Sequence, residues 1–139
     1  MKIFNLARHI ISLLAFVIIG LNANAQTKGD IEAVRISPAN ENTRVVLDVS
    51  KETSFSYFRL RSPERLVVDL KNTNRDFSFD NIDNQSSLIK RIRHSTPKSK
   101  SDLRMVIELT KAVDPGVFSL NPTSDFGHRV VIDLKDPNP

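Results

Sequence analysis

The clearest pattern in this chain is a stretch of alternating apolar and polar residues that occurs twice. Residues 65–71 read Arg-Leu-Val-Val-Asp-Leu-Lys, and residues 129–135 read Arg-Val-Val-Ile-Asp-Leu-Lys. In both copies every second position is apolar, while an arginine, a valine and an aspartate occupy the positions between. A period of two is typical of a β-strand with one buried face. We therefore predict two equivalent half-buried strands whose outer faces carry Arg and Asp.

Similar alternation predicts further strands before each copy of this stretch. In the first half the predicted strands are 31–37, 43–50 and 55–60, and 77–79 is a short candidate. In the second half they are 88–95, 103–111 and 118–120, in the same order. Residues rich in Pro, Asn, Asp and Ser separate these segments, as expected for turns. The pattern indicates an internal duplication of a roughly sixty-residue β unit.

Each unit offers four strands, and a four-stranded sheet with one apolar face needs a second layer to cover it. We predict an all-β fold, a small sandwich of two four-stranded sheets related by the internal duplication. Helix is expected to be minor at most, because no stretch shows a sustained 3.6-residue period. The residues expected between the sheets are Val45, Leu47, Leu66, Val68, Met105, Ile107, Val130 and Ile132.

The first 25 residues differ in kind from the rest. Lys2 and Arg8 precede an apolar run at 10–19, and Ala23-Asn24-Ala25 follows it. These are the three parts of a secretory signal peptide, so cleavage is expected before Gln26. A membrane anchor is the alternative, although about twenty apolar residues are needed to span a bilayer. The expected organisation is a signal peptide at 1–25, a sandwich domain at 26–136 and a linker or tail at 137–139, in the periplasm.

Composition narrows the choice of function. A length of 139 residues with 40% hydrophobic and 26% charged side chains favours one globular domain. The absence of cysteine excludes disulfides, thiolate zinc sites and a cysteine nucleophile. Lys2 and Arg8 would leave with the signal peptide, so the net charge of +4 would fall to +2. The high isoelectric point is then no argument for nucleic acid, and we expect no nucleic-acid partner and no lasting membrane anchor.

No catalytic signature is found in the chain. His94 and His128 stand in no motif for a serine nucleophile or for zinc, and there is no glycine-rich phosphate loop. We therefore expect no catalytic residue, metal or cofactor. Four carboxylates could in principle act as acids or bases, but each has an arginine near it on the same strand face, which favours ionised pairs. They are Asp48, Asp69, Glu108 and Asp133.

The rows of Arg and Asp allow two interpretations. They could form ion pairs on a solvated face, or they could present donors and acceptors at regular spacing to a long polar polymer. A second basic cluster contains Lys90, Arg91 and Arg93 and continues through Lys98, Lys100 and Arg104. This cluster is either a solvated loop or a contact for an anionic polymer such as cell-wall material.

The ordered set of segments resembles the AMIN domain. The matching segments are Val34-Arg35, Arg44 to Asp48, Phe58-Arg59-Leu60 and Arg65 to Leu70, and the likeness covers nearly all of residues 31–136. The resemblance implies a β-sandwich that binds peptidoglycan and localises envelope proteins, notably periplasmic N-acetylmuramoyl-L-alanine amidases at the division septum and type IV pilus secretins. It implies candidate binding residues at Arg44, Asp48, Arg65 and Asp69, and in the second copy at Arg104, Glu108, Arg129 and Asp133. Glu108, which replaces an aspartate, and the basic pair Lys90-Arg91 depart from the pattern.

Three hypotheses follow. The first is a non-catalytic peptidoglycan-binding module that targets cell-wall machinery to the envelope or septum. The second is the N-terminal part of an amidase whose zinc hydrolase domain lies outside this chain. The third is an adaptor that docks on other cell-envelope or divisome proteins through its sheet edges.

Overall fold

The computed structural model describes residues 27–39 and 41–139, which form eight strands and no helix. The strands are β1 (Ile31–Pro38), β2 (Asn42–Val49), β3 (Phe55–Leu60), β4 (Arg65–Leu70), β5 (Ile89–Ser95), β6 (Leu103–Leu109), β7 (Asp114–Leu120) and β8 (His128–Lys135). The predicted signal peptide, residues 1–25, lies outside the described residues. Within the described ranges, no helix has the length and apolar character needed to cross a membrane.

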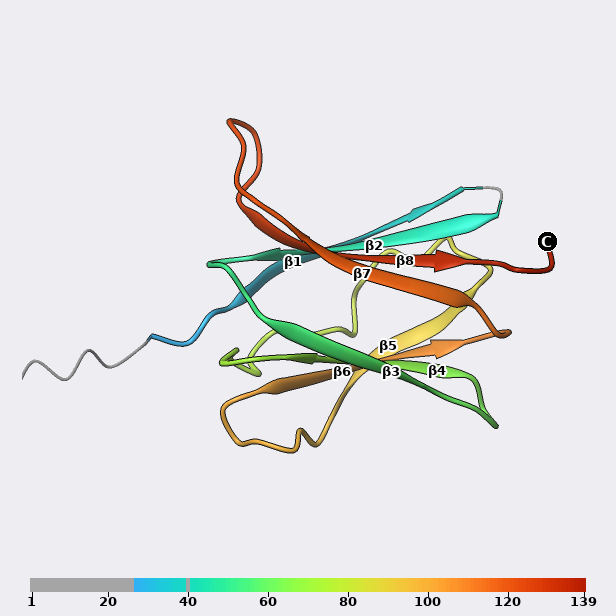
Figure 1. Cartoon of the computed structure of the whole chain (residues 1–139), viewed down its shortest axis with the longest axis horizontal. Coiled ribbons are helices and arrows are strands. Elements are labelled where there is room, and N and C mark those ends of the chain that lie inside the picture. Colours follow the sequence, from blue (N-terminus) through green and yellow to red (C-terminus); the bar gives the residue numbers. More distant parts are fainter. Residues whose placement is uncertain (1–26, 40) are drawn as a thin grey trace, which may run out of the picture.

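The strands form two antiparallel four-stranded sheets stacked as a sandwich (Figure 1). Sheet 1 has the order β1-β2-β8-β7 and sheet 2 the order β3-β4-β6-β5. The predicted all-β sandwich of two four-stranded sheets is therefore confirmed. A pseudo-twofold relation maps β1–β4 onto β5–β8, and with them sheet 1 onto sheet 2.

The repeats do not form one sheet each, although the four strands of each unit suggest that arrangement. Each sheet contains one hairpin from the first half of the chain and one from the second. The two central pairs, β2 with β8 and β4 with β6, join the repeats. Because the middle of each sheet is an inter-repeat contact, neither repeat can complete a sheet alone.

The core consists of the inward-facing residues of the central strands. All eight side chains predicted between the sheets are at most 1% exposed, which confirms the period-two interpretation. Leu70, Leu103 and Leu134 are buried as completely. Burying a side chain of this kind contributes about 1.5–3 kcal/mol. The central strands therefore hold the sheets together and fix which residues face outward.

Two predicted strands differ from the structure. Residues 77–79 form no strand, and Phe79 is instead buried with its ring centroid 4.4 Å from that of His94. The predicted strand at 118–120 is longer and begins at Asp114, so it includes Pro115. Proline is tolerated there because β7 is an edge strand, where a backbone donor can be missing.

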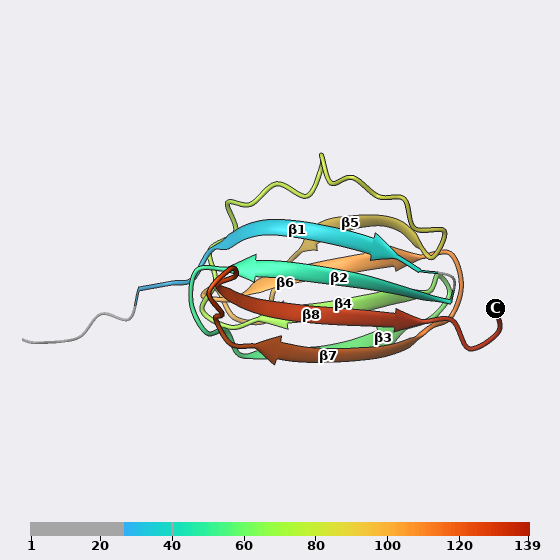
Figure 2. The same ribbon diagram turned by 90° about the horizontal axis from the view of Figure 1, so that it is seen from above.

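A long inter-repeat loop, residues 71–88, connects β4 to β5 and runs along the side of the sandwich where β1 and β5 are the edge strands (Figure 2). Hydrogen bonds to both sheets fix it in place, and two of them involve buried or partly buried side chains of the strands. Thr43 Oγ1 and Ser86 Oγ, both buried, are 2.6 Å apart, and His94 Nε2 lies 2.6 Å from the Phe77 carbonyl oxygen. The loop therefore forms an ordered wall along this side.

Candidate functional site

The outer face of sheet 1 brings together four of the predicted site residues, two from each repeat. The register of β2 and β8 places Arg44 opposite Asp133 and Asp48 opposite Arg129. The inter-repeat pairing creates both contacts, since each pair contains one residue from each copy.

Only one of these opposed pairs forms an ion pair. Arg44 donates two hydrogen bonds to Asp133, with Nε–Oδ1 and Nη2–Oδ2 distances of 2.7 and 2.9 Å. Asp48 instead accepts two hydrogen bonds of 2.9 Å from Arg35 of the neighbouring strand β1. Arg129 turns toward its own loop and donates to the carbonyl oxygens of Gly127 and Asn121 at 3.3 and 3.2 Å.

Sheet 2 repeats this arrangement with the other four predicted residues. Arg104 donates to Asp69 at 2.7 and 2.8 Å, as Arg44 does to Asp133. Arg65 donates to the carbonyl oxygen of Pro63 in the preceding turn, as its counterpart Arg129 donates to a loop. Glu108 takes the place of Asp48.

Glu108 lies between two arginines of the predicted basic cluster. Arg91 Nε is 2.5 Å from Glu108 Oε2, and Arg93 Nε is 3.6 Å from Oε1. The Oε2 atom is buried and accepts no hydrogen bond from the described residues, so its contact with Arg91 is ionic. Arg91 and Arg93 of the predicted basic cluster therefore contact a predicted site residue, Glu108. Lys90 lies in the same strand, β5.

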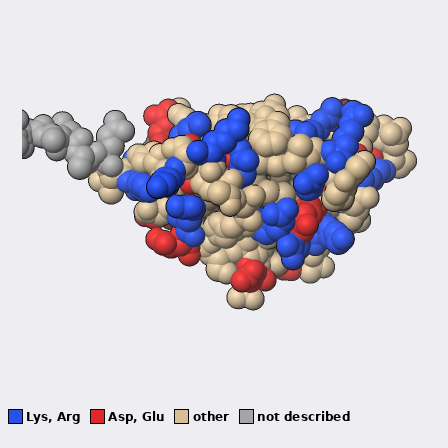
Figure 3. Space-filling model, turned by 90° about the horizontal axis from the view of Figure 1, so that it is seen from below, with Lys and Arg blue, Asp and Glu red and all other residues tan. Residues whose placement is uncertain are grey.

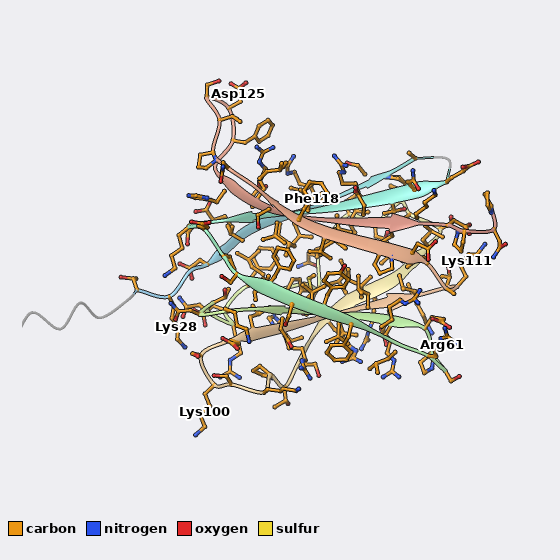
Figure 4. The ribbon with its side chains drawn as sticks, in the orientation of Figure 1. Lys28, Arg61, Lys100, Lys111, Phe118 and Asp125 are labelled. Atoms are coloured by element: carbon orange, nitrogen blue, oxygen red, sulfur yellow. The ribbon has the colours of Figure 1, made fainter. Side chains whose placement is uncertain are left out.

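An exposed phenylalanine completes each cluster, and sequence reasoning did not assign these rings to the site. The guanidinium of Arg44 lies 5.7 Å from the ring centroid of Phe118, and that of Arg104 lies 5.4 Å from the ring centroid of Phe58. Phe118 lies on β7 in the upper layer of Figure 4. The available signal was the recurrence of Phe-x-Leu at equivalent positions in the two halves.

We refer to the two clusters as patch 1 and patch 2. Patch 1, on sheet 1, comprises Arg35, Arg44, Asp48, Phe118 and Asp133. Patch 2, on sheet 2, comprises Phe58, Asp69, Arg93, Arg104 and Glu108. Both lie on outer faces, on opposite sides of the sandwich. Figure 3, viewed from the sheet 2 side, shows basic side chains separated by uncharged surface and by a few acidic groups.

The two patches differ in burial. Asp69 and Arg104 have side-chain exposures of 12% and 16%, whereas Asp133 and Arg44 are 37% and 52% exposed. The hydrogen bonds from Arg104 hold the pKa of Asp69 below its usual value, more than burial raises it. The hydrogen bonds to Asp69 and Asp133 raise the pKa values of Arg104 and Arg44. Asp69 is therefore held ionised in a largely dry environment.

Valines that point outward form an apolar floor beneath the charged groups. Val67, Val106 and Val131 occupy the middle of the outer faces, yet each is at most 3% exposed. Arginine side chains and phenylalanine rings crowd this surface and can cover the valines with their apolar parts. Each patch combines guanidinium donors, an aromatic ring and an apolar floor, which suits a ligand with both polar groups and hydrocarbon faces.

Among the residues that the structure describes, no group of three or more His, Cys, Asp or Glu side chains is placed to hold a metal ion. Outside the patches, Lys98 and Lys100 of the predicted basic cluster lie in the loop between β5 and β6. The cluster is therefore divided between a strand, a loop and patch 2.

Comparison with known proteins identifies the family. The AMIN domain model matches residues 33–134. The N-acetylmuramoyl-L-alanine amidase AmiC of Escherichia coli O6:H1 is 33% identical over 117 residues, which cover 78% of this chain and 27% of the amidase. The protein of the same name from Neisseria meningitidis serogroup B is 32% identical over 108 residues, covering 73% of this chain and 25% of that protein. The chain spans about a quarter of the length of these curated relatives. It belongs to the AMIN domain family.

Proposed function

We propose that this domain is a non-catalytic module that binds peptidoglycan in the periplasm and holds cell-wall machinery at the envelope or septum. The observation that carries the proposal is the presence of two equivalent patches of Arg, carboxylate and Phe on opposite outer faces. Peptidoglycan strands carry sugar rings, hydroxyl groups and carboxylates. Aromatic rings pack against the apolar faces of sugars, and guanidinium groups bind carboxylates.

The arrangement of the patches favours a polymeric ligand. A long polymer offers many copies of one epitope, so a domain with a patch on each side can bridge two strands. Linked binding events of this kind raise retention well above the affinity of either patch alone. The name of both relatives, N-acetylmuramoyl-L-alanine amidase, also refers to the junction of sugar and peptide in such a polymer.

A sedimentation assay with purified cell-wall sacculi tests the proposal. The purified protein is expected to sediment with the sacculi in proportion to the amount added. A β-sandwich protein of the same size and net charge serves as the control. Equal sedimentation of the two proteins would contradict specific binding.

A second candidate function is the N-terminal part of an N-acetylmuramoyl-L-alanine amidase. The observation in its favour is that the chain spans only about a quarter of each AmiC relative. We expect a mass measurement on the protein isolated from its own cells to distinguish the two functions. A larger polypeptide that releases stem peptides from sacculi would support the amidase, whereas a product ending at Pro139 would contradict it.

A third candidate is an adaptor for other envelope or divisome proteins. In its favour, β3 and β7 are edge strands and expose Tyr57, Phe58, Leu60 and Phe118. Exposed strand edges can pair with strands of another protein. Crosslinking in intact cells that recovers one protein and no glycan would support this candidate, and recovery of glycan alone would contradict it.

A further inference from the structure

A cavity of about 390 Å³ opens beside β5, next to patch 2, with which it shares Arg93. Ile36 of β1, Phe79 and Ile82 of the inter-repeat loop, and Ile92 of β5 give it apolar walls. Phe79 and Ile92 belong to the buried core, and Ile36 and Ile82 pack against it. Its volume lies near the lower end of the range of about 300–1,000 Å³ that is usual for ligand pockets. The cavity therefore suits a small group with apolar substituents.

Cationic side chains dominate the charge around the cavity. Lys90, Arg91 and Arg93 line it, and Asp80 is the one carboxylate among the described residues that do so. Arg91 and Arg93 share the charge of Glu108, but Lys90 is exposed to solvent. The excess of positive charge favours an anionic ligand.

One wall of the cavity is the edge of a strand. The consecutive residues 89–93 all line the cavity, and within the described part of the chain β5 pairs with β6 alone. Asn84 Nδ2 donates to the Ile89 carbonyl oxygen at 2.9 Å, so a loop side chain already uses a backbone group on this side. A free strand edge offers donors and acceptors that match an extended peptide backbone.

The cavity is formed in advance of any ligand. The bonds of Ser86 to Thr43 and of His94 to the Phe77 carbonyl fix the inter-repeat loop against both sheets. Phe77 and Phe79 also pack edge to face, with ring centroids 5.4 Å apart. A ligand would therefore lose little binding free energy to ordering the wall.

The basic residues of this cavity are not a requirement of the fold. The register shifts between Ile89 and Arg91 in β5, as it does between Ile31 and Ala33 in β1. These equivalent irregularities align Lys90 with Glu32 and Arg91 with Ala33. The same backbone therefore forms with an acidic and a small residue, so the fold requires neither cation. Arg91 pairs with Glu108, which leaves Lys90 to be explained.

We propose that this cavity binds the end of a short extended peptide of small apolar residues that terminates in a free carboxylate. The peptide backbone pairs with the free edge of β5, its small side chains occupy the apolar walls, and its carboxylate meets Lys90 and the neighbouring arginines. This site borders patch 2 through Arg93, but its apolar walls and Lys90 lie outside both patches, so the proposal does not require that the patches bind peptidoglycan.

Nuclear magnetic resonance titration of the isotopically labelled protein tests the proposal. The probes are N-acetyl-trialanine with a free carboxylate and the same peptide with a carboxamide end. The free acid is expected to shift amide signals within residues 79–93 and to bind up to about fivefold more tightly than the amide, as one exposed ion pair allows. Equal affinity of the two peptides, shifts confined to the patches, or no shift would each overturn the proposal.

Three charge variants sharpen the test. Lys90→Glu is expected to weaken binding of the free acid by at least about fivefold, because attraction becomes repulsion. Lys100→Glu makes the same charge change in the β5–β6 loop, in the lower layer of Figure 4, and should leave binding unchanged. Asp80→Asn removes the opposing carboxylate and should tighten binding. Equal losses for Lys90→Glu and Lys100→Glu would overturn the proposal, because net charge alone would then account for binding.

A patch variant separates this site from the proposed function. Phe58→Ala combined with Phe118→Ala should leave peptide binding unchanged, whether or not it alters retention on sacculi. Loss of peptide binding in this variant would overturn the independence of the cavity.

Discussion

At the residue scale, the two bidentate ion pairs are equivalent in geometry but unequal in burial. Arg104 and Asp69 are mostly covered, whereas Arg44 and Asp133 are largely open to solvent. Water screens an exposed pair, and such pairs contribute little to stability. Removing one partner of a covered pair leaves the other charge without compensation. The same two residue types therefore have different structural roles on the two faces.

This difference predicts a difference in stability. Asp69→Ala should lower the free energy of unfolding by about 2 kcal/mol, because it leaves the Arg104 guanidinium mostly buried and without its carboxylate partner. Asp133→Ala, the matched control on the other face, should cost less than about 1 kcal/mol. Urea denaturation of both variants measures these values. Equal losses would show that burial does not distinguish the pairs.

The pKa of Asp69 predicts how stability depends on pH. Hydrogen bonds from Arg104 lower its pKa in the folded protein from the ordinary value of 3.8. The unfolded chain binds the proton more tightly than the folded protein does. Ionised Asp69 therefore contributes its full stabilisation above the unfolded-state pKa, and this stabilisation is lost as the pH falls through the lower pKa of the folded state. Urea denaturation between pH 2 and 6 should show this loss, and Asp69→Asn should flatten the profile. An unchanged profile in the variant would contradict the assignment.

At the element scale, Arg65 and Arg129 are bound to turns. Arg129 holds the β7–β8 loop through the carbonyl oxygens of Gly127 and Asn121, and its guanidinium lies 4.9 Å from the ring centroid of Phe126. Both arginines were predicted to bind peptidoglycan through the sheet faces, and that function stays a prediction. Their hydrogen bonds give them a role in positioning the loops beside the patches.

Arg129→Ala is therefore expected to loosen the β7–β8 loop without unfolding the domain. The amide of Thr123, which donates to the Phe126 carbonyl oxygen at 2.8 Å, should exchange its hydrogen faster. The free energy of unfolding should change by no more than about 0.5 kcal/mol, as for most surface substitutions. Arg65→Ala, at the equivalent position of sheet 2, should leave Thr123 exchange unchanged. Hydrogen-exchange measurements on both variants compare them directly.

Strands that are long and have one buried face could be predicted from the sequence. The central strands alternate without interruption, so their inward residues could be assigned from the sequence. Residues 77–79 also alternate, but they lie in a loop where Phe79 packs on His94, and no neighbouring strand pairs with them. Pairing depends on what lies alongside a segment, and three alternating residues carry no information about that.

At the scale of the whole molecule, the duplication places one patch on each side of the sandwich. Their opposite placement means that one sugar strand cannot cover both patches at once without wrapping around the domain. Two strands of a network could each occupy one patch. The proposed binding is therefore bivalent, and loss of one patch should have a smaller effect than loss of both.

Sacculus sedimentation should reveal this bivalency. Phe58→Ala and Phe118→Ala should each reduce retention by about tenfold, whereas the double variant should reduce it by about a hundredfold, because losses at two linked sites multiply. Tyr57→Ala is the matched control, because Tyr57 is also exposed on β3 but neighbouring residues of a strand point to opposite faces. Equal retention of the double variant and the control would contradict a role for the patches.

The candidate site was only partly predictable from the sequence. All eight Arg, Asp and Glu positions implied by the resemblance lie on the outer faces, because strand alternation assigns a face to each residue. The partners of these side chains were not evident. Asp48 pairs with Arg35 of β1 rather than with Arg129, which stands opposite it. Phe58 and Phe118 join the patches through contacts between strands distant in the sequence.

The sequence by itself determined the strands, their buried faces and the duplication, because these depend on local alternation and on the burial of apolar side chains. Only the tertiary structure decided which copy pairs with which. Residues 65–70 of β4 and 129–134 of β8 are nearly identical in sequence. Strand β2 could therefore pair with either one and would have Arg opposite Asp in both cases. The folded chain pairs β2 with β8 and β4 with β6, which divides each repeat between two sheets. That choice depends on the connecting loops and on packing between the sheets.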